Sequence, residues 1–159
     1  MKKPIHVLFV CLGKICRSPL AEGAFREHVN SRRLHSHFVI DSAGTGGYHA
    51  GEAPDPRSIK IAETMGIDIS RQSSRKLKRT DFDEFDYIIA MDRSNLRDIK
   101  ARQSAHSNSR ISLMLDELER KGQDVPDPYY GGSDGFRHVW ELVDEATNAL
   151  LERILGESR

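Results

Sequence analysis

The stretch "VLFVCLGKICRSPLAE", residues 7 to 22, decides the fold and raises the first question about function. An apolar run at residues 5–10 leads into a short link with two cysteines, and apolar residues resume after "RSP". A strand that passes through a loop into a helix is the simplest interpretation of this pattern. The question is why Cys11 stands at the end of a strand, six residues before Arg17.

The same alternation recurs along the chain. We expect further strands at 38–44, 85–92 and 110–115, and helices at 56–66, at 94–102 with Ser94 as its N-cap, and at 136–154. Strands that alternate with helices imply a parallel sheet with helices on both faces, in which ligand sites gather at the carboxyl ends of strands. Cys11 stands at such an end.

Length and composition limit the class of protein. A chain of 159 residues predicts a single domain, residues 1–159. Lys plus Arg equals Asp plus Glu at 24 each, which favours neither nucleic acid nor an anionic membrane as a partner. The apolar runs are too short for a membrane span, and the first ten residues do not form a signal peptide. We therefore expect a cytoplasmic protein whose two cysteines are buried, catalytic or redox-active rather than bridged.

The first loop has the chemistry of an anion site. A short loop that runs into a helix start presents unpaired backbone N–H groups, and Arg17 adds a planar fork that can hold two oxygens of a phosphate. The same positive field favours the thiolate, which is the nucleophilic form, at Cys11. Ser18 can donate a hydrogen bond to that sulfur. The loop thus combines anion capture with in-line attack.

Other interpretations of the loop have less support. A lone cysteine after a buried strand is usually a small core residue. The loop lacks the Gly-Lys-Ser/Thr ending of a nucleotide-binding P-loop. Zinc binding by Cys11 and Cys16 needs two further ligands, and the nearby histidines follow no ligand pattern, so no metal is expected.

Four segments together resemble the low-molecular-weight protein tyrosine phosphatases. They are "VCLGKICRSP" at 10–19, "DSAGT" at 41–45, "FDYIIAMDRSNLRD" at 85–98 and "DPYYG" at 127–131. The resemblance implies a Rossmann-like, single-domain α/β fold of the phosphotyrosine phosphatase I type, with a four-stranded parallel sheet. It implies hydrolysis of phosphotyrosine in proteins, with inorganic phosphate as product and no cofactor. For a bacterial source it also suggests a cognate tyrosine kinase as a partner.

The resemblance assigns roles to individual residues. Cys11 forms a phosphocysteine intermediate, Arg17 binds phosphate, and Asp127 is the general acid. An aspartate on a loop is suited to protonate a phenolate leaving group and then to activate water. The expected substrate-binding residues are the loop positions and three tyrosines that wall an aromatic slot: Leu12, Gly13, Lys14, Ile15, Cys16, Ser18, Tyr48, Tyr129 and Tyr130.

Two positions depart from the family pattern, and two other functions stay open. Most relatives carry asparagine where this chain has Lys14 and histidine where it has Gln72, and in the family that asparagine helps to organise the loop, partly through a serine that corresponds to Ser42. The changes favour either weaker or tuned catalysis. An arsenate reductase of the same fold is the nearest alternative, although no cysteine follows Cys16 to serve a thiol relay. A weakly active phosphate-binding module is the third possibility.

Overall fold

The structure of the protein, a computed structural model, describes residues 3–13, 15–46, 50–119, 122–128 and 133–157. Within them, four strands form one parallel sheet in the order β2 (Phe38–Gly44), β1 (Ile5–Cys11), β3 (Tyr87–Ala90) and β4 (Arg110–Leu113). Every strand contains β-branched or aromatic residues, which suit a pleated buried surface. The central strand β1 ends at Cys11, which lies beside Gly44 at the end of β2. The predicted four-stranded parallel sheet is confirmed.

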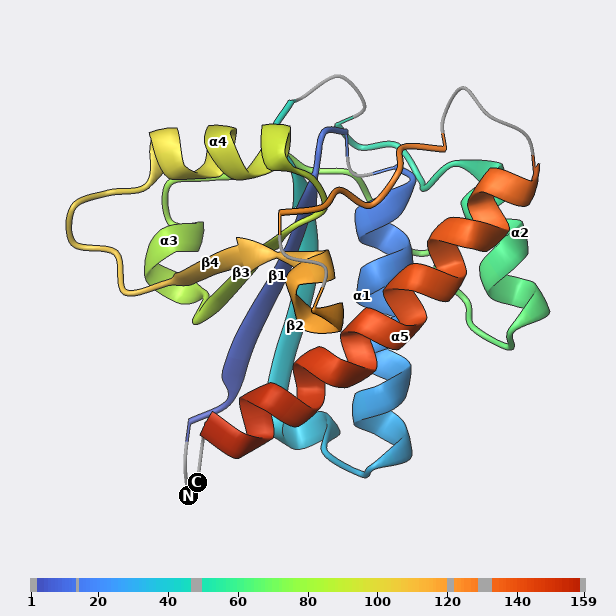
Figure 1. Ribbon diagram of the computed structural model, residues 1–159, viewed down its shortest axis with the longest axis horizontal. Coiled ribbons are helices and arrows are strands. Elements are labelled where there is room, and N and C mark those ends of the chain that lie inside the picture. Colours follow the sequence, from blue (N-terminus) through green and yellow to red (C-terminus); the bar gives the residue numbers. More distant parts are fainter. Residues whose placement is uncertain (1–2, 14, 47–49, 120–121, 129–132, 158–159) are drawn as a thin grey trace.

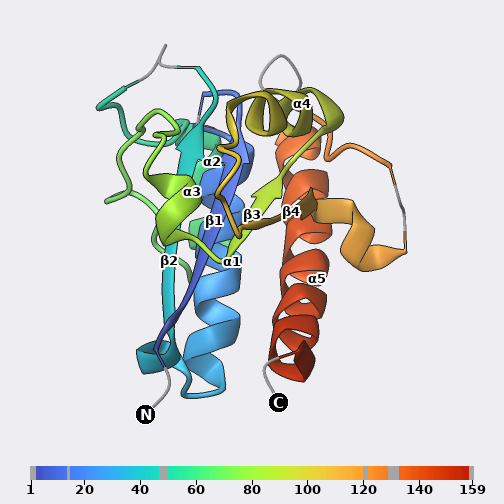
Figure 2. The same ribbon diagram turned by 90° about the vertical axis from the view of Figure 1, so that its left-hand side faces the viewer.

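Helices cover both faces of this sheet (Figure 1). The described segments hold helices α1 (Arg17–Ser31), α2 (Pro56–Thr64), α3 (Asp81–Glu84), α4 (Arg93–Arg102) and α5 (Ser133–Glu157), and the 3₁₀ turns η1 (His35–His37) and η2 (Met114–Leu118). Figure 2 shows α1 and α5 on the same side of the sheet, and residues of these two helices contact each other. The α/β layering follows from βα units whose helices return across the sheet.

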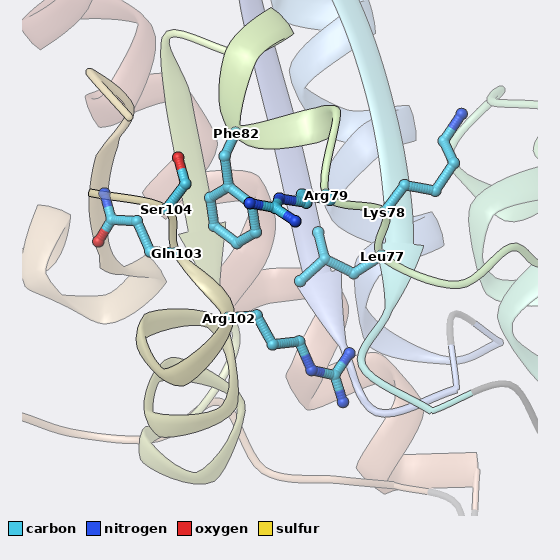
Figure 3. Close-up of a pocket in the computed structure, with 7 residues that line it drawn as sticks. All are labelled: Leu77, Lys78, Arg79, Phe82, Arg102, Gln103 and Ser104. Atoms are coloured by element: carbon cyan, nitrogen blue, oxygen red, sulfur yellow. The ribbon is translucent and has the colours of Figure 1, made fainter. Parts of the chain in front are cut away.

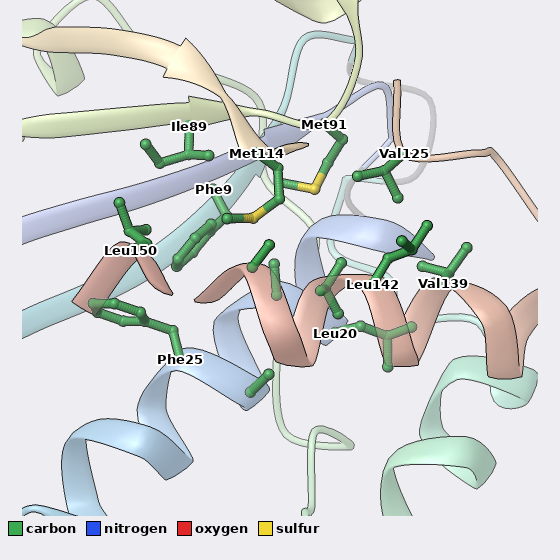
Figure 4. Packing of buried hydrophobic residues seen from close by; sticks show 14 of the residues in the cluster. Phe9, Leu20, Phe25, Ile89, Met91, Met114, Val125, Val139, Leu142 and Leu150 are labelled. Carbon is green, nitrogen blue, oxygen red and sulfur yellow. The ribbon is translucent and has the colours of Figure 1, made fainter. Parts of the chain in front are cut away.

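Two apolar clusters, one on each face, hold the layers together. The larger packs α1, α2 and α5 on the sheet through buried side chains such as Phe9, Phe25, Met91 and Leu150 (Figure 4). The smaller cluster packs α3 and α4 on the opposite face of the sheet, through buried side chains such as Phe82 and Ile99. Strand β1 contributes alternate residues to the two clusters, so it is buried on both faces. This double burial fixes the carboxyl end of β1, and with it Cys11.

The structure differs from the sequence prediction in some element bounds. Ser94 is not the cap of α4, because Asp92 precedes the helix in extended backbone and accepts from the Asn95 N–H at 2.7 Å. Both residues are good caps, and the buried strand that ends just before Asp92 decides between them. Strands β3 and β4 are shorter than expected, and α3 was not anticipated. Within the described segments, no helix combines the length and the apolar character that a bilayer span requires.

Candidate active site

The two ends of the first loop meet at the carboxyl edge of the sheet. Cys11 is the last residue of β1 and Arg17 is the first residue of α1, and both are buried at 3% exposure. The hydroxyl oxygen of Ser18, in the first turn of α1, lies 3.1 Å from the Cys11 sulfur. When the sulfur is a thiolate, only the hydroxyl can donate in this pair. The contact between Ser18 and Cys11 that the sequence predicts is therefore present.

Arg17 is fixed by partners far away in the chain. Its Nη1 donates to Asp92 Oδ2 at 2.8 Å and to the Val125 carbonyl at 2.9 Å. Its Nη2 lies 3.7 Å from Asp127 Oδ2. Burial lowers the pKa of Arg17, but the neighbouring Cys11 and the carboxylates outweigh it and raise the pKa above its ordinary value. The guanidinium is therefore a permanent, oriented cation beside the sulfur.

Asp92 is a site residue that the sequence did not single out. One of its oxygens caps α4 and the other binds Arg17. The available signal was its place directly after a buried strand, at the same sheet edge as Cys11. The expected strand 85–92 ends at Asp92 and the expected cap is Ser94, so the sequence prediction indicates neither of the two roles of Asp92.

The segment that carries Asp127 is tied to the same edge. The Val125 N–H donates to the Met91 carbonyl at 2.8 Å, and Asp124 accepts from both the backbone and the side chain of Arg93. Asp127 lies two residues after Val125, and its side chain is 44% exposed. Its carboxylate is thus held near Arg17 by the preceding residues while it stays open to solvent.

The wall behind the loop is made of backbone. The N–H groups of Thr45 and Gly46 donate to the carbonyls of Cys11 and Leu12 at 2.9 and 2.8 Å. On the other side, the Asp55 N–H donates to the Ile15 carbonyl at 2.7 Å. These bonds fix the loop against β2 and against the start of α2.

The two cysteines of the loop differ in environment. Cys16 is 4% exposed, and burial, with the nearby carboxylates and Cys11, raises its pKa to about 12. Its thiol is therefore protonated at neutral pH and unsuited to nucleophilic attack. Of the two cysteines, Cys11 is the one whose sulfur contacts the Ser18 hydroxyl.

The residues expected to bind substrate are only partly described. Leu12 is 46% exposed, and Ile15 is half-buried against the larger core cluster. Gly13 lies in the described part of the loop and offers its backbone. Lys14, Tyr48, Tyr129 and Tyr130 lie outside the described residues.

Gln72 occupies the place that the resemblance gives to a histidine. Its side-chain oxygen lies 3.4 Å from the hydroxyl of the buried Ser42, and its amide nitrogen donates to the Pro19 carbonyl at 3.1 Å. Ser42 also donates to Glu22, which is buried in α1. A polar link between this segment and the start of α1 thus exists with glutamine at position 72.

Other hollows on the described surface do not bring a cysteine, a hydroxyl and a guanidinium together as the first loop does. One of about 410 Å³ lies between α3 and the end of α4 (Figure 3). Leu77 and Phe82 line it, together with three basic side chains, Lys78, Arg79 and Arg102. It contains no nucleophile beside a base. Across the described ranges, no group of three His, Cys, Asp or Glu is arranged to hold a metal ion.

Comparison with known proteins agrees with the site. The family model "Low molecular weight phosphotyrosine protein phosphatase" matches residues 6–159. The chain is 47% identical over 154 residues to the protein of that name from Schizosaccharomyces pombe, covering 94% of this chain and 97% of the relative. The crystal structure of YfkJ from Bacillus subtilis is similar with a TM-score of 0.92 at 38% identity, covering 99% of both chains.

Another similar structure is named for a different activity. It is a Drosophila protein described as an arginine phosphatase, with a TM-score of 0.87 at 31% identity, covering 93% of this chain and 96% of that one. The family match extends over nearly the whole chain, from residue 6 to residue 159. The chain belongs to the low molecular weight phosphotyrosine protein phosphatase family.

Proposed function

We propose that this protein-tyrosine phosphatase hydrolyses phosphotyrosine in proteins through a phosphocysteine intermediate on Cys11. In the first step the Cys11 thiolate attacks phosphorus, an S–P bond forms and the P–O bond to tyrosine breaks. Asp127, in its acid form, donates its proton to the leaving oxygen. In the second step Asp127 removes a proton from water, the water oxygen attacks phosphorus and the S–P bond breaks. Tyrosine and inorganic phosphate are released.

One observation carries the proposal: a single short loop brings a sulfur, a hydroxyl and an oriented guanidinium together. The hydroxyl of Ser18 lies 3.1 Å from the Cys11 sulfur and stabilises it both as a thiolate and as a leaving group. The amides at the start of α1 add positive potential at the same point.

Arg17 is suited to bind the phosphoryl group. Asp92 and the Val125 carbonyl hold Nη1, which orients the planar group, and Nη2 extends toward Asp127. A guanidinium fixed in this way presents its remaining N–H groups to two phosphoryl oxygens without further ordering. The bound phosphate then lies between the nucleophile and the general acid.

Asp127 is suited to proton transfer on the leaving-group side. Its carboxylate is 3.7 Å from Arg17 Nη2 and half-exposed, so it can reach a substrate that enters from solvent. The exposed Leu12 supports contact with an aromatic ring above the loop. For the location we propose the cytoplasm, where a thiolate nucleophile stays reduced. A cognate tyrosine kinase is the proposed partner that supplies phosphorylated proteins.

The nucleophile is tested by rapid quench with an excess of aryl phosphate, followed by mass analysis of the peptide that contains both cysteines. We expect a phosphoryl adduct on Cys11 in the wild type and a burst of phenol release. Cys11→Ser should lose turnover by at least about 10⁴-fold and keep phosphate binding. Cys16→Ser, in the same loop, keeps the backbone N–H that the loop offers to phosphate and changes only a buried side chain, so it is the matched control and should retain turnover. An active Cys11→Ser variant would remove the assignment.

The substrate class is tested with peptides that differ only in the phosphorylated residue. Phosphotyrosine should be hydrolysed far faster than phosphoserine, because the shorter side chain cannot reach the base of a deep loop. Phosphoarginine is included because a similar structure is described as an arginine phosphatase. An assay with arsenate and thioredoxin tests for arsenate reductase activity. Reduction of arsenate without hydrolysis of phosphotyrosine would favour that alternative.

A further inference from the structure

The described backbone carbonyls of the phosphate loop accept hydrogen bonds from outside the loop. Each described carbonyl from Cys11 to Cys16 accepts a hydrogen bond from another part of the chain. Three of these bonds come from backbone N–H groups, those of Thr45, Gly46 and Asp55. The other two come from serine hydroxyls, and these two can be removed by side-chain truncation without a change to the backbone.

The two serines reach the loop from opposite sides. The Ser74 hydroxyl donates to the Gly13 carbonyl at 2.7 Å, and the Ser58 hydroxyl donates to the Cys16 carbonyl at 3.2 Å. Ser58 is fully buried and Ser74 is 6% exposed. Neither has a place in the chemistry described above, and both are more than 40 residues from their acceptors in sequence.

The backbone of each serine is itself held in place. The N–H of Ser74 donates to the Glu52 carbonyl at 2.7 Å, and its carbonyl accepts from the Gly51 N–H at 2.8 Å. Three residues later, Leu77 lies in the smaller core cluster and its N–H donates to the Gly44 carbonyl (Figure 3). Ser58 lies in the first turn of α2, where its N–H donates to the Asp55 carbonyl at 2.9 Å.

A planar trans peptide points its N–H away from its C=O. Bonds that hold the described carbonyls toward the surrounding segments therefore leave the opposite side of these peptides for the inside of the loop, which is the proposed anion site. N–H groups fixed before the reaction need no reorganisation as charge develops, and this favours the transition state over the bound substrate.

We infer that Ser58 and Ser74 are positioning residues, which hold the phosphate loop in the conformation that binds the transition state. The inference rests on the proposed role of the loop as the phosphate site. It predicts that loss of either hydroxyl lowers kcat/KM about fivefold to twentyfold, the range expected for one buried hydrogen bond that acts on the transition state. The double Ser58→Ala/Ser74→Ala variant should lose at least about 25-fold, because only backbone donors remain.

The test compares a transition-state analogue with a ground-state ligand. Vanadate, which forms a pentacoordinate adduct, should bind the Ala variants about fivefold to twentyfold more weakly, whereas the dissociation constant for inorganic phosphate should change less than about threefold. Ser74→Thr keeps a hydroxyl and Ser74→Val has nearly the same volume without one. The Thr variant should therefore recover vanadate binding and the Val variant should not.

Ser31→Ala is the matched control, because the Ser31 hydroxyl donates to a backbone carbonyl, that of His28 at 3.0 Å, away from the site. It should leave kcat/KM unchanged. Loss of thermal stability with wild-type vanadate binding in the serine variants would make both serines merely structural and overturn the inference, as would equal behaviour of Thr and Val. Failure of the proposed function looks different, because the wild-type protein itself would then fail to hydrolyse aryl phosphates and phosphotyrosine peptides.

Discussion

Gly44 offers a stringent test of how tightly the phosphate loop is packed. A Cβ atom at this position would lie 2.6 Å from the Leu12 carbonyl oxygen, 3.0 Å from the Gly13 carbonyl carbon and 3.1 Å from the Gly46 carbonyl oxygen. All three neighbours are backbone atoms, so no side chain can rotate away. Gly44→Ala therefore requires a movement of either β2 or the loop.

The structure indicates which of the two moves. Gly44 is paired with Cys11 at the end of β2, its N–H donates to the Arg75 carbonyl at 2.9 Å and its carbonyl accepts from the Leu77 N–H at 2.7 Å. Residues 12–13 of the loop lie outside the strands, so they can move with the loss of fewer backbone hydrogen bonds than Gly44. Extending the 2.6 Å contact to an ordinary distance of about 3.3 Å displaces the Leu12 carbonyl by about 0.7 Å, and displacements on this scale cost up to about 100-fold in rate.

We therefore expect Gly44→Ala to lower kcat/KM by about tenfold to 100-fold and to destabilise the fold by about 1–3 kcal/mol. The assay is steady-state hydrolysis of an aryl phosphate, with circular dichroism and urea unfolding on the same preparations. Gly156→Ala in α5 is the control, because its Cβ would meet nothing within 4 Å and alanine favours a helix. A folded Gly44→Ala protein with wild-type kcat/KM would refute the claim that the loop is fixed by backbone contact with β2.

Three further predictions concern protons and charge at the site. Asp127→Asn should slow hydrolysis most for esters of weakly acidic phenols, because these depend most on protonation of the leaving oxygen, and equal losses across a series of phenols would exclude the general-acid role. The pKa of Cys16 is raised from 9.0 to about 12, so above pH 9 the folded protein keeps a proton on this thiol that the unfolded chain loses. Cys16 should therefore lower the free energy of unfolding by about 1.4 kcal/mol for each pH unit above pH 9. Urea unfolding between pH 8 and 10.5 should show that the unfolding free energy falls less steeply with pH in Cys16→Ser than in the wild type. Equal slopes in the two proteins would contradict the prediction. Lys14→Asn should raise kcat if asparagine orders the loop better, whereas a loss of kcat/KM confined to pH below about 6 would show that the lysine charge matters more.

The sequence alone determined the βα alternation and the catalytic loop, because both are encoded by neighbouring residues. The apolar run before Cys11, the spacing from Cys11 to Arg17 and the periodicity after residue 136 are local patterns, and each predicts an element or a site without reference to the rest of the chain. The carboxyl-edge rule for parallel sheets then placed Cys11 at a ligand site. Resemblance to the family supplied Asp127, whose role in a turn is otherwise the simpler interpretation of "DP".

Only the tertiary structure decided what holds the loop in its working shape. Arg17 is oriented by Asp92 and by the Val125 carbonyl, which are 75 and 108 residues away, and the serines that meet the loop carbonyls are 42 and 61 residues from their acceptors. No short-range pattern encodes a bond between a side chain and a distant carbonyl, because its geometry depends on how strands and helices pack. Asp92 shows the limit most clearly: the sequence presents a helix start after a strand, and only the order of strands in the sheet brings its second oxygen to Arg17.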